Sequence, residues 1–267
     1  MEQLLKDPAE FASTVLLIFQ MILLFLVLAR ALRAIRTEAR DNLMVLFAFS
    51  VGCFLVNDFY WLAHALLLPG VRMPFSVSEI GDNGIFLFYS MLLSTAFPER
   101  CEKKSVFVLT ALFAAANTGL WIGWSGEWVK DIVGGLVFGW FLCVAVRSLW
   151  ITHALSRGEW CVLGGACLVL IAAQTAIFFV PEHWARVLDT FCYVLLFIVV
   201  LLWCVKTFLA WRKGDSHVFL SLAFACAAWI SCTMYMSAGW MYFFADLCCT
   251  LMLPVELLAV RMEVAEA

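Results

Sequence analysis

The chain has 267 residues, of which 65% are hydrophobic and 14% are charged, and its formal net charge is −3. A soluble domain carries about 45–50% apolar and about 25% charged residues, so this composition excludes an ordinary water-soluble fold and predicts an all-α integral membrane protein. The Lys and Arg residues are spread thinly along the chain and form no basic patch or nucleic-acid recognition motif. We therefore expect no nucleic acid partner.

Nine segments are long and apolar enough to be transmembrane helices. A helix needs about 20 apolar residues to cross the hydrocarbon core, and runs of this length do not fit the alternating strands of a barrel. All connections are short, so we predict one transmembrane domain over residues 1–267, with any chemistry inside the bundle or at its rim. The predicted helices cover approximately residues 13–33, 42–67, 76–97, 104–124, 129–153, 159–180, 185–210, 217–236 and 240–260.

Basic residues are distributed unevenly between the predicted loops, with thirteen of the 17 Lys and Arg on one side of the membrane. Cytoplasmic loops hold most Lys and Arg because moving these charges across the bilayer is costly. The residues before the first apolar run include Glu2, Asp7 and Glu10, whereas a cleavable signal peptide begins with basic residues. We therefore predict a multi-pass protein of the cell membrane, with its N-terminus outside, its C-terminus in the cytoplasm and its inner loops beside lipid head groups.

After the first predicted helix, the other eight form four hairpins that we interpret as a candidate internal repeat. Each helix that returns to the cytoplasm carries an Asp near its outer start, and the preceding helix carries an amide or a small polar group. Repeats of this kind are common in membrane transporters. The four acids are Asp82, Asp131, Asp189 and Asp246, and the amides are Asn57, Asn117 and Gln174.

These four acids predict a ring of carboxylates at the outer end of the bundle, with Asp58 nearby. A carboxylate at membrane depth costs at least about 2.5–3.5 kcal/mol and normally faces a cavity or a partner. Facing inward, the ring would bind a small cationic or zwitterionic ligand, a proton or a lipid head group. The alternative is helix capping, because Asp is favoured in the first turn of any helix.

The second predicted helix is the most polar segment inside the membrane. Asn57, Tyr60 or Trp61, and His64 recur at helical spacing on one face, with Asp58 about 100° round the helix. One interpretation is an outer-leaflet site where His64 and a carboxylate handle a proton. The alternative, which also applies to Asn117 and Gln174, is hydrogen bonding between helices.

Other chemical patterns are weak. Ser76, Ser78, His64 and Asp82 flank one loop, but no nucleophile-elbow motif supports a hydrolase. The four histidines divide between the two sides of the membrane and there is no Cys pair at metal-binding spacing, so we expect no metal site and no cofactor. The eleven cysteines are interpreted as small packing residues.

The sequence also predicts structural roles for two charged residues near the cytoplasmic side and for two groups of glycines. Glu256 and Lys206 are expected to extend to the cytoplasmic interface. The alternative for Glu256, which lies two residues after Pro254, is an inner gate or a proton acceptor. Glycines at 134, 135 and 139, and at 164 and 165, are expected to let another helix approach closely.

Three functions remain open at this stage. The first is a small transporter or ligand-binding membrane protein. Its predicted site contains the acids Asp58, Asp82, Asp189 and Asp246, the amides Asn57, Asn117 and Gln174, and His64. The second is an intramembrane enzyme acting on a lipid substrate, with His64, Asp58 and Asp82 as catalytic candidates. The third is a sensory or assembly subunit that acts through a membrane protein partner.

Overall fold

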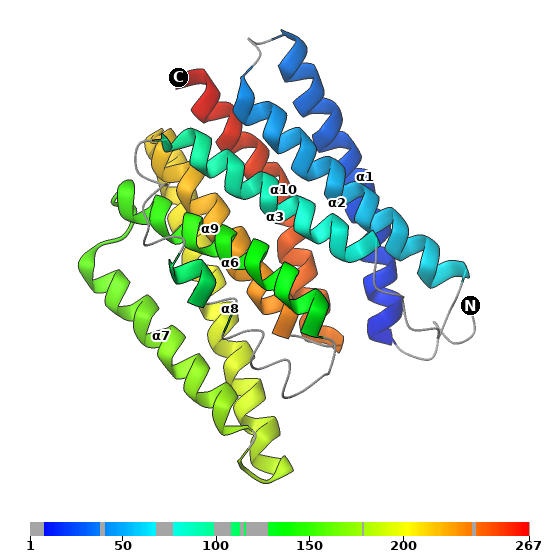
Figure 1. The fold of residues 1–267 in the computed structure, drawn as a ribbon, viewed down its shortest axis with the longest axis vertical. Helices are drawn as coiled ribbons and strands as arrows, with labels where there is room; N and C mark the ends of the chain where they lie inside the picture. Colours follow the sequence, from blue (N-terminus) through cyan, green and yellow to red (C-terminus); the bar gives the residue numbers. More distant parts are fainter. Residues whose placement is uncertain are drawn as a thin grey trace.

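A computed structural model of the chain describes residues 8–37, 41–67, 77–98, 108–112, 115, 128–177, 179–236 and 239–266. Within these residues every long element is an α-helix and no strand occurs (Figure 1). The helices are α1 (Pro8–Thr37), α2 (Asn42–Leu67), α3 (Val77–Ala96), α6 (Trp128–Ile151), α7 (Arg157–Ala176), α8 (Glu182–Lys213), α9 (Ser216–Met236) and α10 (Gly239–Glu266).

Eight of the nine predicted segments coincide with these helices to within a few residues. The ninth, 104–124, lies mostly outside the described residues. Helices α1 to α3 run in alternating directions and so do α6 to α10, whereas α3 and α6 run in the same direction (Figure 1).

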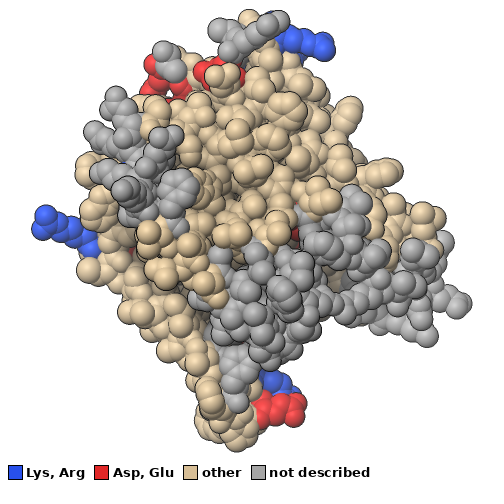
Figure 2. Space-filling model, in the orientation of Figure 1, with Lys and Arg blue, Asp and Glu red and all other residues tan. Residues whose placement is uncertain are grey.

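Six of the helices are long and apolar enough to cross a membrane, namely α1, α2, α6, α8, α9 and α10. The other two, α3 and α7, have 20 residues each and do not meet the same criterion of length and hydropathy. Large apolar side chains on the outside of the bundle, such as Phe25 (63% exposed) and Leu201 (65% exposed), require lipid as their surroundings. In Figure 2 the visible Lys, Arg, Asp and Glu side chains gather mainly toward the margins of the molecule. These features identify a helical membrane protein.

The packing is organised around α9 and α10. Helix α9 packs against α6, α8 and α10, and its residues 219–228 are all buried. Helix α10 packs against α9, α1 and α2, while α3 lies between α2 and α6. Helix α7 packs mainly against α8, and the α7–α8 pair joins the rest of the bundle mainly through α9. A proline, Pro254, lies inside α10, which continues through it to Glu266.

Two glycines in α3 lie where this helix approaches α2 closely. A Cβ atom at Gly81 would lie 2.8 Å from the Cβ of Asn57, and one at Gly84 would lie 2.7 Å from the Sγ of Cys53. Both distances are too short for any other residue, so the glycines allow α3 to pack directly on α2.

The glycines expected to mark close packing give a mixed result. Gly135 and Gly139 are buried in α6. The expectation for Gly164 and Gly165 was wrong, because a Cβ at either position would have no atom within 4 Å. Their side of α7 faces away from the other described helices, and small residues there reflect no close contact.

Candidate functional site: carboxylates shared by α2, α3 and α10

The first carboxylate of the site, Asp246, lies on the buried face of α10. Its side chain is 5% exposed, and its Oδ1 accepts a hydrogen bond of 3.1 Å from Nε2 of Gln20 in α1. Gln20 is itself 1% exposed. It is a polar residue within the apolar run of α1, and its burial is explained by this contact because a buried amide needs a partner.

The second and third carboxylates are on α2 and α3. Asp58 is 4% exposed, and its neighbour Asn57 is 5% exposed. The Nδ2 of Asn57 donates a hydrogen bond of 2.8 Å to Oδ1 of the half-buried Asp82. The absence of a side chain at Gly81 lets Asn57 reach α3, so the glycine contact and the polar contact depend on each other.

The three carboxylates are close enough for their charges to interact. Asp58 interacts with both Asp246 and Asp82, and the phenol of Tyr242, one turn before Asp246 on α10, interacts with all three. No Lys or Arg among the described residues forms an ion pair with Asp58 or Asp246. We call these four residues, with Asn57 and Gln20, the outer carboxylate cluster, after the side of the membrane that the sequence predicts for them.

Two buried oxygen atoms of this cluster have no hydrogen-bond partner among the residues that the structure describes. They are Oδ2 of Asp58 and Oδ1 of Asn57. Leaving a buried acceptor unsatisfied costs about 1–3 kcal/mol, and more if the group is charged. The cluster therefore has an unmet requirement for hydrogen-bond donors or positive charge.

His64 does not join the carboxylates. It is half-buried in the last turn of α2, its ring lies 6.4 Å from that of Tyr60, and its Nε2 has no partner. No described contact links it to Asp58 or Asp82, which the enzyme hypothesis requires. The described residues therefore do not assemble the arrangement predicted for a lipid-acting enzyme.

The predicted ring is brought together only in part. Asp82 and Asp246 each interact with Asp58, which was predicted to lie near the ring. Asp189 interacts instead with Tyr193 on its own helix, α8, which packs against α7 and α9. Asn117 and the side chains of Asp131 and Gln174 lie outside the described part of the structure.

The expectation that Glu256 extends to the cytoplasmic interface was wrong. Its side chain is 3% exposed and accepts a hydrogen bond at Oε2 from the hydroxyl of Tyr89 in α3. The reason is the orientation of α10, whose buried face includes Leu253, Glu256 and Leu257. Neither Tyr89 nor Gln20 was identified from the sequence as a site residue, although a single Gln in the apolar run of α1 was a usable signal.

Lys206 lies at the end of the bundle predicted to be cytoplasmic. Its Nζ forms an ion pair with Glu159, in the first turn of α7, and donates to the carbonyl oxygen of Ala154 at 3.2 Å. The hydrogen bond from Lys206 holds the pKa of Glu159 below its ordinary value. Glu159 also completes a capping box with Ser156, so it fixes the start of α7 as well as the end of α8.

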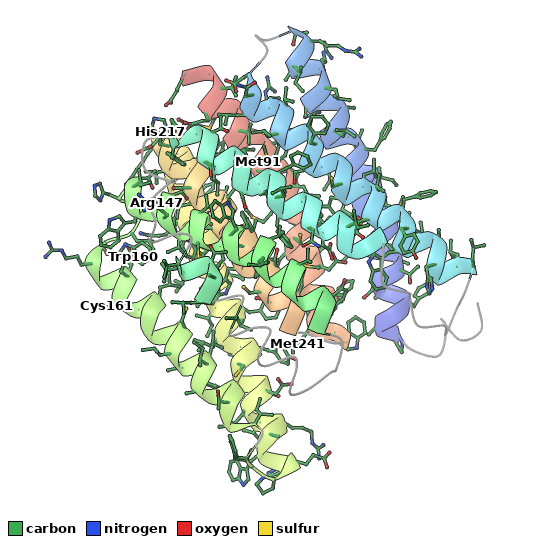
Figure 3. All side chains as sticks on the ribbon, viewed as in Figure 1. Met91, Arg147, Trp160, Cys161, His217 and Met241 are labelled. Atoms are coloured by element: carbon green, nitrogen blue, oxygen red, sulfur yellow. The ribbon has the colours of Figure 1, made fainter. Side chains whose placement is uncertain are left out.

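At the same end of the bundle, α10 carries a third buried acid. Glu263 is 4% exposed and lies 2.6 Å from Nδ1 of His217, whose side chain is 62% exposed. Ser216 donates to Glu263 at 2.8 Å. Figure 3 shows His217 at this end of the bundle and Met241, near the start of α10, at the opposite end.

Among the described residues, no three His, Cys, Asp or Glu side chains come close enough to one another to hold a metal ion. The search for known relatives found no matching family model, no matching curated protein and no matching solved structure.

Proposed function

We propose that this chain is a small multi-pass transporter or ligand-binding protein of the cell membrane, with a site for a small organic cation or zwitterion at the outer carboxylate cluster. The observation that carries the proposal is the unpartnered Oδ2 of Asp58, buried beside the carboxylates of Asp82 and Asp246 without a described basic partner. A positively charged ligand would supply the missing charge and the missing donors.

An ammonium group fits this chemistry better than a bare metal ion. Its N–H groups can be shared between the oxygens of Asp58 and Asn57, whereas a metal ion would need several oxygen ligands around one point. The ring of Tyr242, which is 37% exposed at the edge of the cluster, adds a surface that attracts cations. Among the described residues, no three His, Cys, Asp or Glu side chains lie close enough together to bind one metal ion, and this includes the three carboxylates of the cluster.

The test is the thermal stability of the purified full-length protein in detergent, measured with and without methylammonium, ethylammonium and ethanolamine. A ligand present at 100 times its Kd stabilises the folded state by about 2.7 kcal/mol. We expect at least one of these cations to raise the melting temperature, and Asp58→Asn and Asp246→Asn to abolish that increase.

The matched control is Glu182→Gln, which removes an exposed carboxylate paired with Arg186 at the start of α8. The control should keep the wild-type response to the cation. The proposal fails if no cation changes the melting temperature, or if the Asn variants respond as the wild type does.

The proposed orientation places the N-terminus outside and the C-terminus in the cytoplasm, with the cluster toward the outer leaflet. It is supported by the uneven distribution of Lys and Arg. A reporter enzyme fused after residue 267 should be active only in the cytoplasm. Activity of that fusion outside the cytoplasm would place the carboxylate cluster in the inner leaflet and remove this part of the proposal.

A further inference from the structure

We propose that Glu256 is a proton-binding site in the middle of the bundle, separate from the outer carboxylate cluster, and that its proton is the coupling ion of the transport activity. The coupling role rests on the proposed function. Proton binding by Glu256 does not, and it can be measured in the purified protein without any transported substrate.

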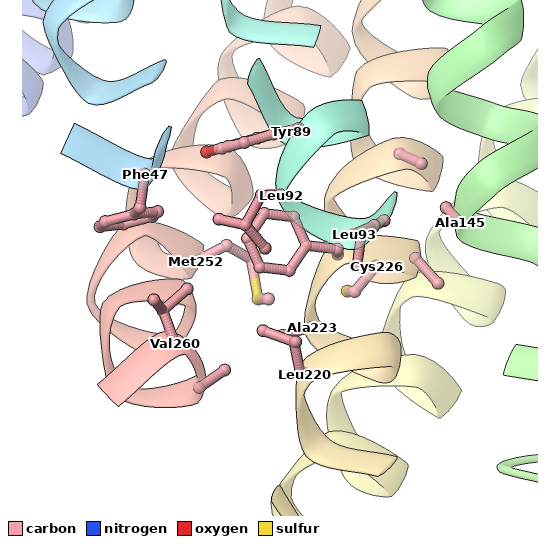
Figure 4. Close-up of a cluster of buried hydrophobic side chains, with 14 of the residues drawn as sticks. Phe47, Tyr89, Leu92, Leu93, Ala145, Leu220, Ala223, Cys226, Met252 and Val260 are labelled. Atoms are coloured by element: carbon pink, nitrogen blue, oxygen red, sulfur yellow. The ribbon is translucent and has the colours of Figure 1, made fainter. Parts of the chain in front are cut away.

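The first support is the burial of the pair that Glu256 forms with Tyr89. Both side chains are at most 4% exposed, and the Tyr89 hydroxyl is the one described donor that reaches the Glu256 carboxylate. In Figure 4, Tyr89 lies at the edge of a cluster of buried apolar side chains that includes Phe47, Leu92 and Met252. A carboxylate in such surroundings is strongly destabilised in its charged form unless it has a positive partner.

The second support is that the surroundings provide no such partner. The titratable groups that interact with Glu256 are Tyr89 from α3, Cys226 from α9 and Cys249 from α10 itself. No described Lys, Arg or His forms an ion pair with it, and Ser50 is the polar residue that α2 places beside Tyr89. A proton is the one positive charge that this apolar volume can accept without additional ligands.

The third support is the place of Glu256 along α10. Asp246 is ten residues earlier, or about 15 Å along the helix axis, and Glu263 is seven residues later, or about 10 Å. Asp246 belongs to the outer carboxylate cluster, whereas Glu263 is bonded to the exposed His217 at the other end of the bundle. Glu256 therefore lies between two polar sites that are toward opposite ends of α10.

The chemical step is a reversible protonation. The Glu256 carboxylate gains a proton from water on one side and becomes a neutral carboxylic acid, and it returns the proton when water reaches it from the other side. Tyr89 keeps its own proton throughout, donating to the charged carboxylate or to the carbonyl oxygen of the acid. No bond other than O–H is formed or broken.

The experiment is infrared difference spectroscopy of the purified full-length protein as the pH is changed. The carbonyl stretch of a protonated carboxyl group absorbs apart from the backbone bands. We expect one such band to change with pH in the wild type and in Glu182→Gln, and to be absent from Glu256→Gln. Tyr89→Phe should keep the band but shift its frequency and its titration midpoint, because the hydrogen bond is lost while the acid remains.

The outcomes separate this proposal from the proposed function. An Asp58→Asn/Asp246→Asn double variant should lose its response to organic cations and keep the Glu256 band. A wild-type spectrum in both Glu256→Gln and Tyr89→Phe would overturn proton binding at Glu256, whatever the cation response. Tyr89→Phe guards against the possibility that Glu256→Gln fails to fold, because it removes one hydroxyl group and leaves the carboxyl in place.

Coupling is tested in proteoliposomes that contain a pH-sensitive dye and the cation identified by thermal stability. In the wild-type protein, an applied cation gradient should change the pH of the lumen. Glu256→Gln should reduce that pH change at least tenfold while retaining cation binding. Cation uptake with an unchanged lumenal pH in the wild type would overturn the coupling role.

Discussion

Gln20 of α1 and Asp246 of α10 are separated by 226 residues in the sequence and are joined by a hydrogen bond of 3.1 Å in the interior. This bond links the first and last helices and gives a buried acid a neutral partner. It also restrains one oxygen of Asp246 while leaving the charge of the carboxylate uncompensated. The contact thus orients a member of the outer carboxylate cluster without neutralising it.

Replacing Gln20 with Leu should destabilise the protein and disturb the cluster. The change leaves Oδ1 of Asp246 without its donor, and an unsatisfied buried group costs about 1–3 kcal/mol. We expect a lower melting temperature in detergent and a weaker response to organic cations. Phe19→Leu, next to it on the exposed side of α1, is the control and should have little effect. Equal melting temperatures for the two variants would contradict the structural role of Gln20.

Replacing Gly81 with Ala should also be destabilising. The added Cβ would lie 2.8 Å from the Cβ of Asn57, so α2 and α3 would have to separate or Asn57 would lose its bond to Asp82. Overpacking of this kind costs about 1–3 kcal/mol. Gly52→Ala is the matched control in α2, because nothing lies within 4 Å of its added Cβ, and there Ala should stabilise the helix slightly. A melting temperature of Gly81→Ala that is higher than that of Gly52→Ala would rule out the close contact between Gly81 and Asn57.

The response of Asp189→Asn distinguishes a three-helix cluster from the four-hairpin ring expected from the sequence. Asp189 interacts with Tyr193, and its described contacts do not connect it to Asp58 or Asp246. We therefore expect Asp189→Asn to keep the cation-dependent rise in melting temperature that Asp58→Asn loses. Loss of the response in both variants would favour a ring that includes α8.

The ion pair between Glu159 and Lys206 should contribute a pH-dependent stability. The pKa of Glu159 is lowered from 4.5, first by the hydrogen bond from Lys206, so the folded state favours the charged form. The stabilisation is present above pH 4.5 and is lost as the pH falls through the lowered pKa. Because the pair is partly solvated, its contribution should be below about 1 kcal/mol.

The measurement is the melting temperature of wild type and Glu159→Gln from pH 7 down to pH 3. The difference between the two proteins should be largest at neutral pH and should shrink in acid. A difference that stays constant over this range would show that the charge of Glu159 is not what stabilises the junction of α7 and α8.

The helices could be predicted from the sequence because their signals are local. Apolar runs of membrane length, interrupted by residues such as Pro69 and Gly214, define segments that coincide with eight helices. Gly214 adopts φ 75° and ends α8, as a turn glycine is expected to do. Packing of one helix on another is not local, which is why the close contacts at Gly81 and Gly84 were not anticipated while contacts at Gly164 were expected in error.

The site could be predicted only in outline for the same reason. Asp82 and Asp246 were recognised as acids at a shared depth, and Asp58 was placed near them. Which acids meet depends on the neighbours of α10, and the sequence does not show that α10 packs against α1 and α2. The burial of Glu256 follows from that same packing, so hydropathy alone assigned it to the interface.

Pro254 lies in α10 between the two carboxylates that the proposals use, Asp246 and Glu256. Proline lacks an amide hydrogen, so the backbone carbonyl of Thr250, one turn earlier, has no helical hydrogen-bond donor. Helix α10 is therefore less stiff between Thr250 and Pro254. Flexure about this point would swing the two halves of α10 relative to each other. A ligand held by the first half could thereby alter how tightly the second half is packed, without any rearrangement of the surrounding helices.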